Sequence, residues 1–341
     1  MRWPWQSKAG TGVLAIGSAA DALTWVSCDT RGKPGRLRCG VEPLTGTDAA
    51  EAGRRLRELG LPPDPVVAVL SLQDCQLLQI DAPAVQPDEL KAAARWHIKD
   101  LIDGRLDDMT IDVMVVGDDK PRPQRHLFVA AARNAVVRAV AERSQAAGMA
   151  LSVIDIRENA QRNLQSALAR AQGLEARATA ALMVHGTQCL LTICAGGELY
   201  FARRIDWDDL VASHGADAAP APATMASDLE NMDFIDYGAM NDSGPAAAVD
   251  ETPRLVIELQ RSLDVWERSW PDLPLARLWV QVGEMSAALV AMLATTLATR
   301  VEVFEPEQVF PGFDAAATTP ALRAAVLPLL GALLRSESRQ L

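Results

Sequence analysis

The stretch GVLAIGSAADALTWVSCD, residues 12–29, decides how the chain begins to fold. Two apolar runs, 13–16 and 22–28, flank a turn of small and polar residues, and this pattern predicts a β-hairpin. The backbone N–H groups of such a hairpin can hold phosphate oxygens. Phosphate and metal chemistry usually needs a carboxylate nearby, and the first run carries none. The hairpin therefore predicts the shape of a nucleotide-binding loop and leaves its chemistry in question.

The residues after the hairpin extend it into a β-β-β-α-β unit. A strand-like run at 37–41 leads to a helix predicted over 47–60, and 65–71 is a continuous apolar run typical of a buried strand. The helix carries the usual start, stripe and stop signals, namely Thr47 or Asp48 as N-cap, Leu56 and Leu59 on the buried face, and Gly60 after the last turn.

The second half of the chain repeats this order of elements. Its first five are strands at 178–186, 188–197 and 198–206, a helix at 253–270 and a strand at 276–283. Each half then continues with further helix and strand patterns, at 151–156 and 157–173 in the first half and at 285–299, 300–304 and 320–335 in the second. The letters themselves are not repeated, so the duplication is architectural. We predict an α/β protein of two lobes, 1–175 and 176–341.

Two insertions interrupt the symmetry. Residues 73–148 add a strand, helix, strand, strand and helix, which predicts a subdomain inserted in the first lobe. Residues 213–252 are rich in Ala, Pro, Asp and Gly, and no Lys or Arg lies between Arg204 and Arg254. Such a stretch buries too little apolar surface to offset its ordering entropy, so we expect a solvated, disordered loop. The alternative is an acidic contact for a basic partner.

Composition excludes several classes of function. The formal net charge is −11 at pH 7, which disfavours binding to nucleic acid or to an anionic bilayer. The five cysteines form no C-x-x-C pair, so we expect a reducing compartment with no disulfide and no metal site. No apolar run is long enough to span a bilayer, which takes about 20 residues. The composition predicts a cytoplasmic protein.

The first insertion carries a family resemblance. Its stretch PAVQPDELKAAARWHIKDLIDGRLDDMTIDVMVV, residues 83–116, resembles PilM-type proteins, and most of all their MshI branch. The stretches at 255–283 and 327–335 resemble the same family. The resemblance implies an actin-like, ribonuclease-H-like fold. It also implies a cytoplasmic scaffold of type IV (MSHA-type) pilus assembly, peripherally associated with the inner membrane through a bitopic PilN/MshJ-like partner whose cytoplasmic N-terminal peptide it docks.

The same resemblance implies where a nucleotide would lie. Actin-like ATPases hold it between the lobes with two glycine hairpins, each beginning with an Asp, and a Gly-Gly turn under the adenosine. Here Ala15 and Val184 stand in place of the acids, and a single Gly283 precedes Glu284. We therefore expect no hydrolysis, no metal and no cofactor. The alternative is an active ATPase, or weak ATP binding, through a degenerate cleft formed by Gly17, Ser18, Gly186, Thr187 and Gly283. A third hypothesis is the related cytoplasmic domain of a type II secretion scaffold, which resembles GspL.

The helix predicted at 87–104 is the candidate partner site. Asp88 is its expected cap, Gly104 its expected end, and Leu90, Ala94, Ile98 and Leu101 its expected buried stripe. Trp96 lies off that stripe. The favoured interpretation is that Trp96 folds over the subdomain edge as a small satellite core. The alternative is that Arg95, Trp96 and Lys99 line a groove for a partner peptide, because Trp flanked by Arg is typical of binding hot spots. Separately, His185 is expected to be an exposed turn residue.

Overall fold

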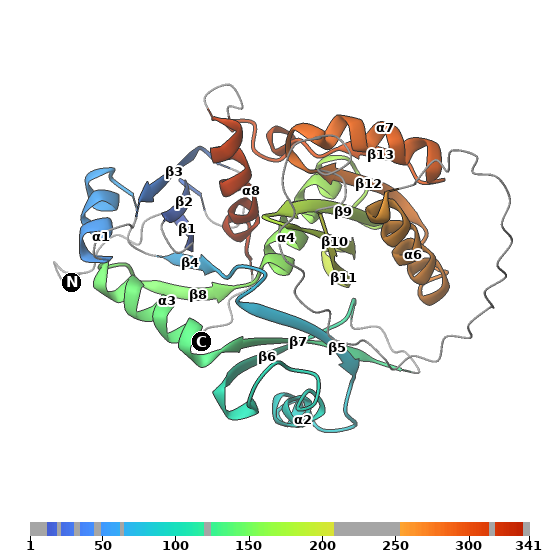
Figure 1. Cartoon of the computed structure of the whole chain (residues 1–341), viewed down its shortest axis with the longest axis horizontal. Coiled ribbons are helices and arrows are strands. Elements are labelled where there is room, and N and C mark those ends of the chain that lie inside the picture. Colours follow the sequence, from blue (N-terminus) through green and yellow to red (C-terminus); the bar gives the residue numbers. More distant parts are fainter. Residues whose placement is uncertain are drawn as a thin grey trace, which may run out of the picture.

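The computed structural model describes residues 12–18, 22–30, 35–43, 49–61, 65–118, 124–207, 253–313 and 318–336. The acidic stretch 213–252 and the predicted caps Thr47 and Asp48 lie outside these residues. Figure 1 shows two sheets side by side, with a third sheet below them. In the described part of the chain, no helix is both long and apolar enough to cross a membrane.

The first sheet has the strand order β3-β2-β1-β4-β8. The opening stretch forms the hairpin of β1 (Val13–Ser18) and β2 (Ala22–Cys28), paired from Val13 opposite Cys28 to Ser18 opposite Leu23. On one side β3 (Leu37–Pro43) pairs antiparallel with β2, and on the other β4 (Val66–Val69) and β8 (Leu151–Asp155) run parallel to β1. The predicted hairpin is confirmed.

The second sheet repeats the first with the order β11-β10-β9-β12-β13. Its strands are β9 (Ala178–His185), β10 (Gln188–Ala195), β11 (Glu198–Asp206), β12 (Leu275–Gln281) and β13 (Val301–Val303). As in the first sheet, three antiparallel strands are followed by two parallel ones. This duplication confirms the predicted α/β, actin-like fold.

Two helices exchange lobes between the sheets. Helix α4 (Arg157–Ala171) follows β8 but packs on β9, β10 and β11, whereas α8 (Pro320–Leu333) follows the second sheet but packs on β1 to β4. They cross at Gly331, where a Cβ would lie only 1.6 Å from the carbonyl oxygen of Ala160. Only glycine allows this approach, so the crossing depends on that position.

The remaining helices cover the sheets. Helix α1 (Ala49–Glu58) packs against α3 (Asn134–Ala146), α6 (Arg254–Ser269) packs against β11, and α7 (Ser286–Thr296) packs against β12 and β13. After α1, Gly60 adopts a φ of +68° and ends the helix as predicted. The prediction for Leu59 was wrong: it is exposed, because the chain reverses at Gly60 and buries Leu61 instead.

The inserted subdomain has its own sheet. The strands β5 (Cys75–Asp81), β7 (His126–Arg133) and β6 (Met109–Val115) pair antiparallel in the order β5-β7-β6. Helix α2 (Leu90–His97) packs against β6 and lies at the bottom of Figure 1, on the side of this sheet away from the two lobes. Its sheet-facing side buries Ala94 and Ile98, as predicted.

Three expectations for α2 were wrong. The helix ends at His97, not near Gly104, and Asp88 makes no cap because the N-cap residue is Glu89. Since the chain leaves the helix after Ile98, the helical spacing no longer applies, and Ile102 is buried in place of Leu101, which is 55% exposed.

Candidate functional site: the cleft between the lobes

The first hairpin faces the crossing of α4 and α8. A Cβ at Gly17 would lie 3.1 Å from Leu329 Cδ2 and 3.8 Å from Arg157 Nη2. Leu329 comes from α8 and is fully buried, and Arg157 is the first residue of α4. The backbone of Gly17, which would lie against phosphate in an actin-like nucleotide site, therefore lies against an apolar side chain and a guanidinium group of the protein itself.

Arg157 connects this hairpin to its neighbours. Its Nε donates a hydrogen bond of 3.1 Å to the carbonyl oxygen of Leu70, just after β4. Burial lowers the pKa of Arg157 to about 10, while the nearby charges of Glu158 and Asp74 raise it, so the guanidinium is still cationic at neutral pH. Its buried Nη1 has no hydrogen-bond partner among the described residues.

The second hairpin approaches the same helix. Gly186 turns between β9 and β10 with a φ of +70°. The preceding His185 is partly buried, and its Nε2 lies 3.1 Å from Oε1 of Gln161, one turn after Arg157 on α4. Burial, followed by the charges of Arg157 and Arg204, lowers the pKa of His185 well below its usual 6.5. The expectation of an exposed turn histidine was wrong, because α4 covers the end of β9.

Two glutamines continue the polar face of α4 into the second sheet. Gln161 Nε2 donates to the carbonyl oxygens of Ala181 (3.0 Å) and Leu190 (2.9 Å). Gln165, which is fully buried, donates to the carbonyl oxygen of Thr179 at 2.7 Å and accepts from Thr192 Oγ1 at 2.6 Å. Side-chain amides therefore join α4 to the middle of the sheet with directed bonds.

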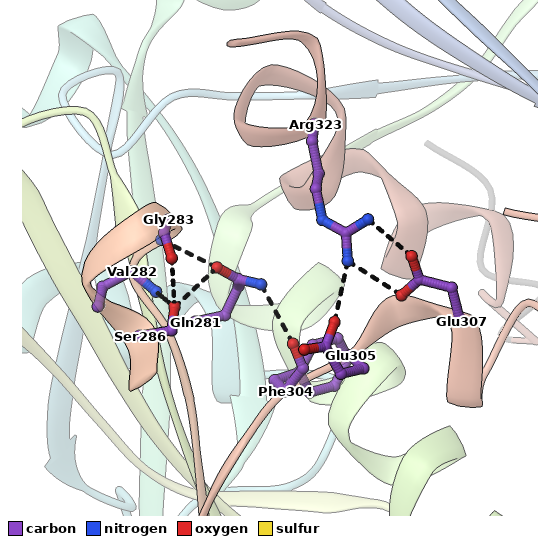
Figure 2. A network of polar contacts seen from close by, with 8 residues as sticks. All are labelled: Gln281, Val282, Gly283, Ser286, Phe304, Glu305, Glu307 and Arg323. Atoms are coloured by element: carbon purple, nitrogen blue, oxygen red, sulfur yellow. Dashed lines mark hydrogen bonds and ion pairs between the residues drawn. The ribbon is translucent and has the colours of Figure 1, made fainter. Parts of the chain in front are cut away.

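The third part of the predicted cleft, the turn at Gly283, is closed by its own side chains (Figure 2). Gln281 Oε1 accepts from the backbone N–H of Gly283 at 2.9 Å and from Ser286 Oγ at 3.2 Å. Ser286 Oγ in turn accepts from the N–H of Val282 at 2.9 Å. Donors that would face an adenosine in the family pattern are thus used within the turn.

Figure 2 also shows how α8 is held beside this turn. Arg323 makes a two-bond contact with Glu307, at 2.7 and 3.0 Å, and a further bond of 3.0 Å to Glu305. These carboxylates follow β13, so the ion pairs attach the start of α8 to the second lobe while its later residues cover the first sheet. The hydrogen bonds that Arg323 donates to Glu307 and Glu305 raise its pKa.

The residues present do not fit a magnesium–nucleotide complex. Ala15 is fully buried at the first acid position, and Val184 stands at the second. Asp29, the carboxylate that follows β2, accepts a hydrogen bond of 2.8 Å from the backbone N–H of Arg36. Among the described residues, no three His, Cys, Asp or Glu side chains gather in a geometry that could hold a metal ion. Mg²⁺ prefers oxygen ligands of this kind, and the cleft does not present them.

Arg204 is a functional residue that the sequence patterns did not single out. From β11 it forms an ion pair of 2.8 Å with the buried Glu158 of α4 and donates to the carbonyl oxygens of Leu72 and Cys75 (2.7 Å). These carbonyls lie where the chain enters the inserted subdomain. Arg204 therefore fixes the subdomain to the second lobe. Its partner Glu158 lies 46 residues earlier in the chain, so no local motif marks the pair in the sequence.

The predicted partner helix exposes its tryptophan. Trp96 is 68% exposed on the outer side of α2, so the favoured satellite-core interpretation was wrong. Its neighbour Arg95 turns back to the loop after the helix, where it bonds to Met109 O at 3.3 Å and pairs with Asp107 at 3.7 Å. Lys99, in the turn after the helix, is exposed. The structure places Gly17 beside Leu329 and Arg157 and places His185, just before Gly186, beside Gln161, and it leaves Trp96 and Lys99 at the surface.

Comparisons with known proteins bear on the fold. No protein-family model and no curated protein sequence matches the chain. Among solved structures, it resembles a chain of the PilM-PilN type IV pilus biogenesis complex, with a TM-score of 0.61 and 18% identity over 95% of this chain and 98% of that one. This likeness supports the actin-like arrangement over nearly the whole length.

Two other solved structures resemble the chain less. The cytoplasmic domain of EpsL, an inner-membrane component of the type II secretion system of Vibrio cholerae, has a TM-score of 0.40 and 16% identity over 59% of this chain and 75% of that one. A Bacteroides thetaiotaomicron protein with an actin-like ATPase fold and unknown function has a TM-score of 0.47 and 9% identity over 88% and 93%.

Proposed function

We propose that this protein is a non-catalytic scaffold of type IV pilus assembly, in the PilM-like family and its MshI branch. The observation that carries the proposal is the match to a chain of the PilM-PilN complex over 95% of the sequence, together with the family stretches at 83–116 and 255–283. The partner would be an inner-membrane PilN/MshJ-like protein. The scaffold would then be cytoplasmic and held at the membrane by that partner.

The proposed docking surface is the outer side of α2. Trp96 is 68% exposed on α2, and an exposed aromatic side chain is the usual anchor of a binding hot spot. Lys99 lies beside it, and Arg95 keeps the following loop in place. The three residues act together: Trp96 as the apolar anchor, Lys99 as the rim charge and Arg95 as the support.

The docking test is a binding titration with the cytoplasmic N-terminal peptide of the PilN-like protein from the same organism. Trp96→Ala should weaken binding about 30-fold, as for a hot-spot residue of about 2 kcal/mol. Val265→Ala is the matched control, because Val265 is an exposed apolar residue (42%) on α6. Equal affinity for the native chain and Trp96→Ala, with both folded, would remove α2 from the interface.

The non-catalytic part of the proposal has a separate test. The cleft lacks both acids at Ala15 and Val184, and the Gly283 turn bonds to itself. A phosphate-release assay with Mg-ATP should give no turnover above the buffer rate. Turnover that disappears in a Gly186→Val variant would establish the active-ATPase alternative instead.

A further inference from the structure

We propose that the first turn of α4 is a built-in substitute for the metal–nucleotide bridge of the actin-like fold, in which Arg157 holds the first hairpin and Gln161 the second without any ligand. This inference concerns the cleft alone and holds or fails independently of what docks at Trp96. It starts from the disagreement between the residues of the cleft and a magnesium–nucleotide complex.

The first half of the bridge is the contact with the first lobe. Arg157 Nε bonds to Leu70 O at 3.1 Å, and Nη2 lies beside Gly17, 3.8 Å from the position that a Cβ would take. The guanidinium thus lies against the backbone of β1, on the side where phosphate oxygens would approach. Leu329 also packs there, with its Cδ2 3.1 Å from the same Cβ position.

The second half of the bridge is the contact with the second hairpin. Gln161, on the same face of α4 as Arg157 because the two are four residues apart, binds His185 just before the β9–β10 turn. Arg157 is near enough for its charge to act on His185. One helical turn of α4 therefore faces both hairpins.

A metal site presents negatively charged ligands, whereas this position presents the positively charged guanidinium group of Arg157. Among the described residues Arg157 forms no ion pair, because Glu158 next to it is paired with Arg204 at 2.8 Å. A fixed cation in a poorly solvated cleft repels Mg²⁺ and needs no carboxylates to retain it. The cation near the hairpins is therefore a side chain of the protein, Arg157, and not a bound metal ion.

The test is amide hydrogen exchange on the full-length protein, in the presence and absence of 1 mM Mg-ATP. We expect Mg-ATP to leave the β1–β2 and β9–β10 hairpins unchanged. Arg157→Met should speed exchange in both hairpins by about tenfold or more, through local opening of the cleft, while the β5–β7 sheet keeps its native rate. Arg157→Lys, which keeps the charge but not the fork of donors, should fall between them.

The matched control is Arg170→Met. Arg170 lies on the same helix, its side chain is 64% exposed, and its loss changes the net charge by the same amount. It should not alter either hairpin. Two results would overturn the proposal: hairpin exchange in Arg157→Met that is unchanged or no faster than a uniform rise across all sheets, or protection of the native hairpins by Mg-ATP.

Discussion

Helices α4 and α8 occupy equivalent places in the two lobes, yet they hold their sheets in different ways. Helix α8 buries only apolar side chains against the first sheet, namely Val326, Leu327, Leu329, Leu330, Ala332 and Leu333. Helix α4 buries Glu158, Gln161, Arg162 and Gln165 as well as four leucine and alanine positions. Apolar packing is not directional, whereas hydrogen bonds are. Helix α8 is therefore held on the first sheet by apolar packing, and α4 is held on the second sheet by directed hydrogen bonds.

The largest loss of stability is expected from a substitution in α8, which is held by apolar packing. Leu329→Ala should lower the free energy of unfolding by about 3 to 4 kcal/mol, because it removes a fully buried side chain that fills the space beside Gly17. Urea denaturation measures the change. Leu101→Ala, on a residue 55% exposed, is the control and should stay within about 0.5 kcal/mol. A small loss at Leu329 would mean that the first hairpin is not packed by α8.

The crossing itself should respond nearly as strongly. Gly331→Ala should cost about 3 kcal/mol, because a Cβ would lie 1.6 Å from Ala160 O and the two helices would have to separate. Gly312→Ala is the matched substitution, since no atom lies within 4 Å of the added methyl group. Equal thermal midpoints for the two variants would contradict the close crossing.

A substitution on the polar face of α4 should give a smaller loss of stability. Gln165→Ala should cost about 2 kcal/mol, because it leaves the buried groups of Thr179 and Thr192 without their partner. Gln145→Ala on the exposed face of α3 controls for the loss of an amide. If denaturation showed Gln165→Ala to be as stable as Gln145→Ala, directed bonds would not be what holds α4 to the second sheet.

The smallest effect is a pH dependence. The folded pKa of His185 lies below its unfolded value near 6.5, so between these two values the unfolded state binds more protons. The stability that neutral His185 contributes is fully present above pH 6.5 and is lost as the pH falls toward its pKa in the folded state. His185→Gln should therefore flatten the decline of the urea midpoint below pH 6.5. Parallel midpoint curves for the two proteins would show that His185 titrates normally.

Much of the fold could be predicted from the sequence. The strands of both lobes appear in the sequence as alternating or continuous apolar runs. These runs are easy to recognise because the faces of each sheet are covered and the strand residues are buried. The errors fell where a chain reversal shifts the spacing, at Leu59 and Leu101, both replaced by a later residue in the core. Local periodicity cannot show which residue a turn will bring back to the core.

The candidate site was less predictable. The turns at Gly186 and Gly283 follow from the sequence and both have a positive φ, whereas Gly17 lies inside β1 and the side chains packed around it were not predicted. Glutamine and arginine are usually exposed, so a helix rich in them gives no sign that Gln161 and Gln165 face a sheet. Their burial follows from α4 crossing to the other lobe, which is a long-range property. The favoured interpretation, which folded Trp96 over the subdomain edge, was wrong for the same reason, because the exposure of Trp96 depends on the direction of α2.

The exchange of helices also has a consequence for biosynthesis. The strands of the first sheet leave the ribosome before the helix that covers them, because α8 comes after all the strands of the second sheet. The side of that sheet around Ala15 and Val67 is therefore left uncovered throughout translation, and long-range contacts of this kind slow folding and favour association of exposed strands. A nascent chain should therefore need chaperone protection until α8 has been made, although the folded protein buries the same surface.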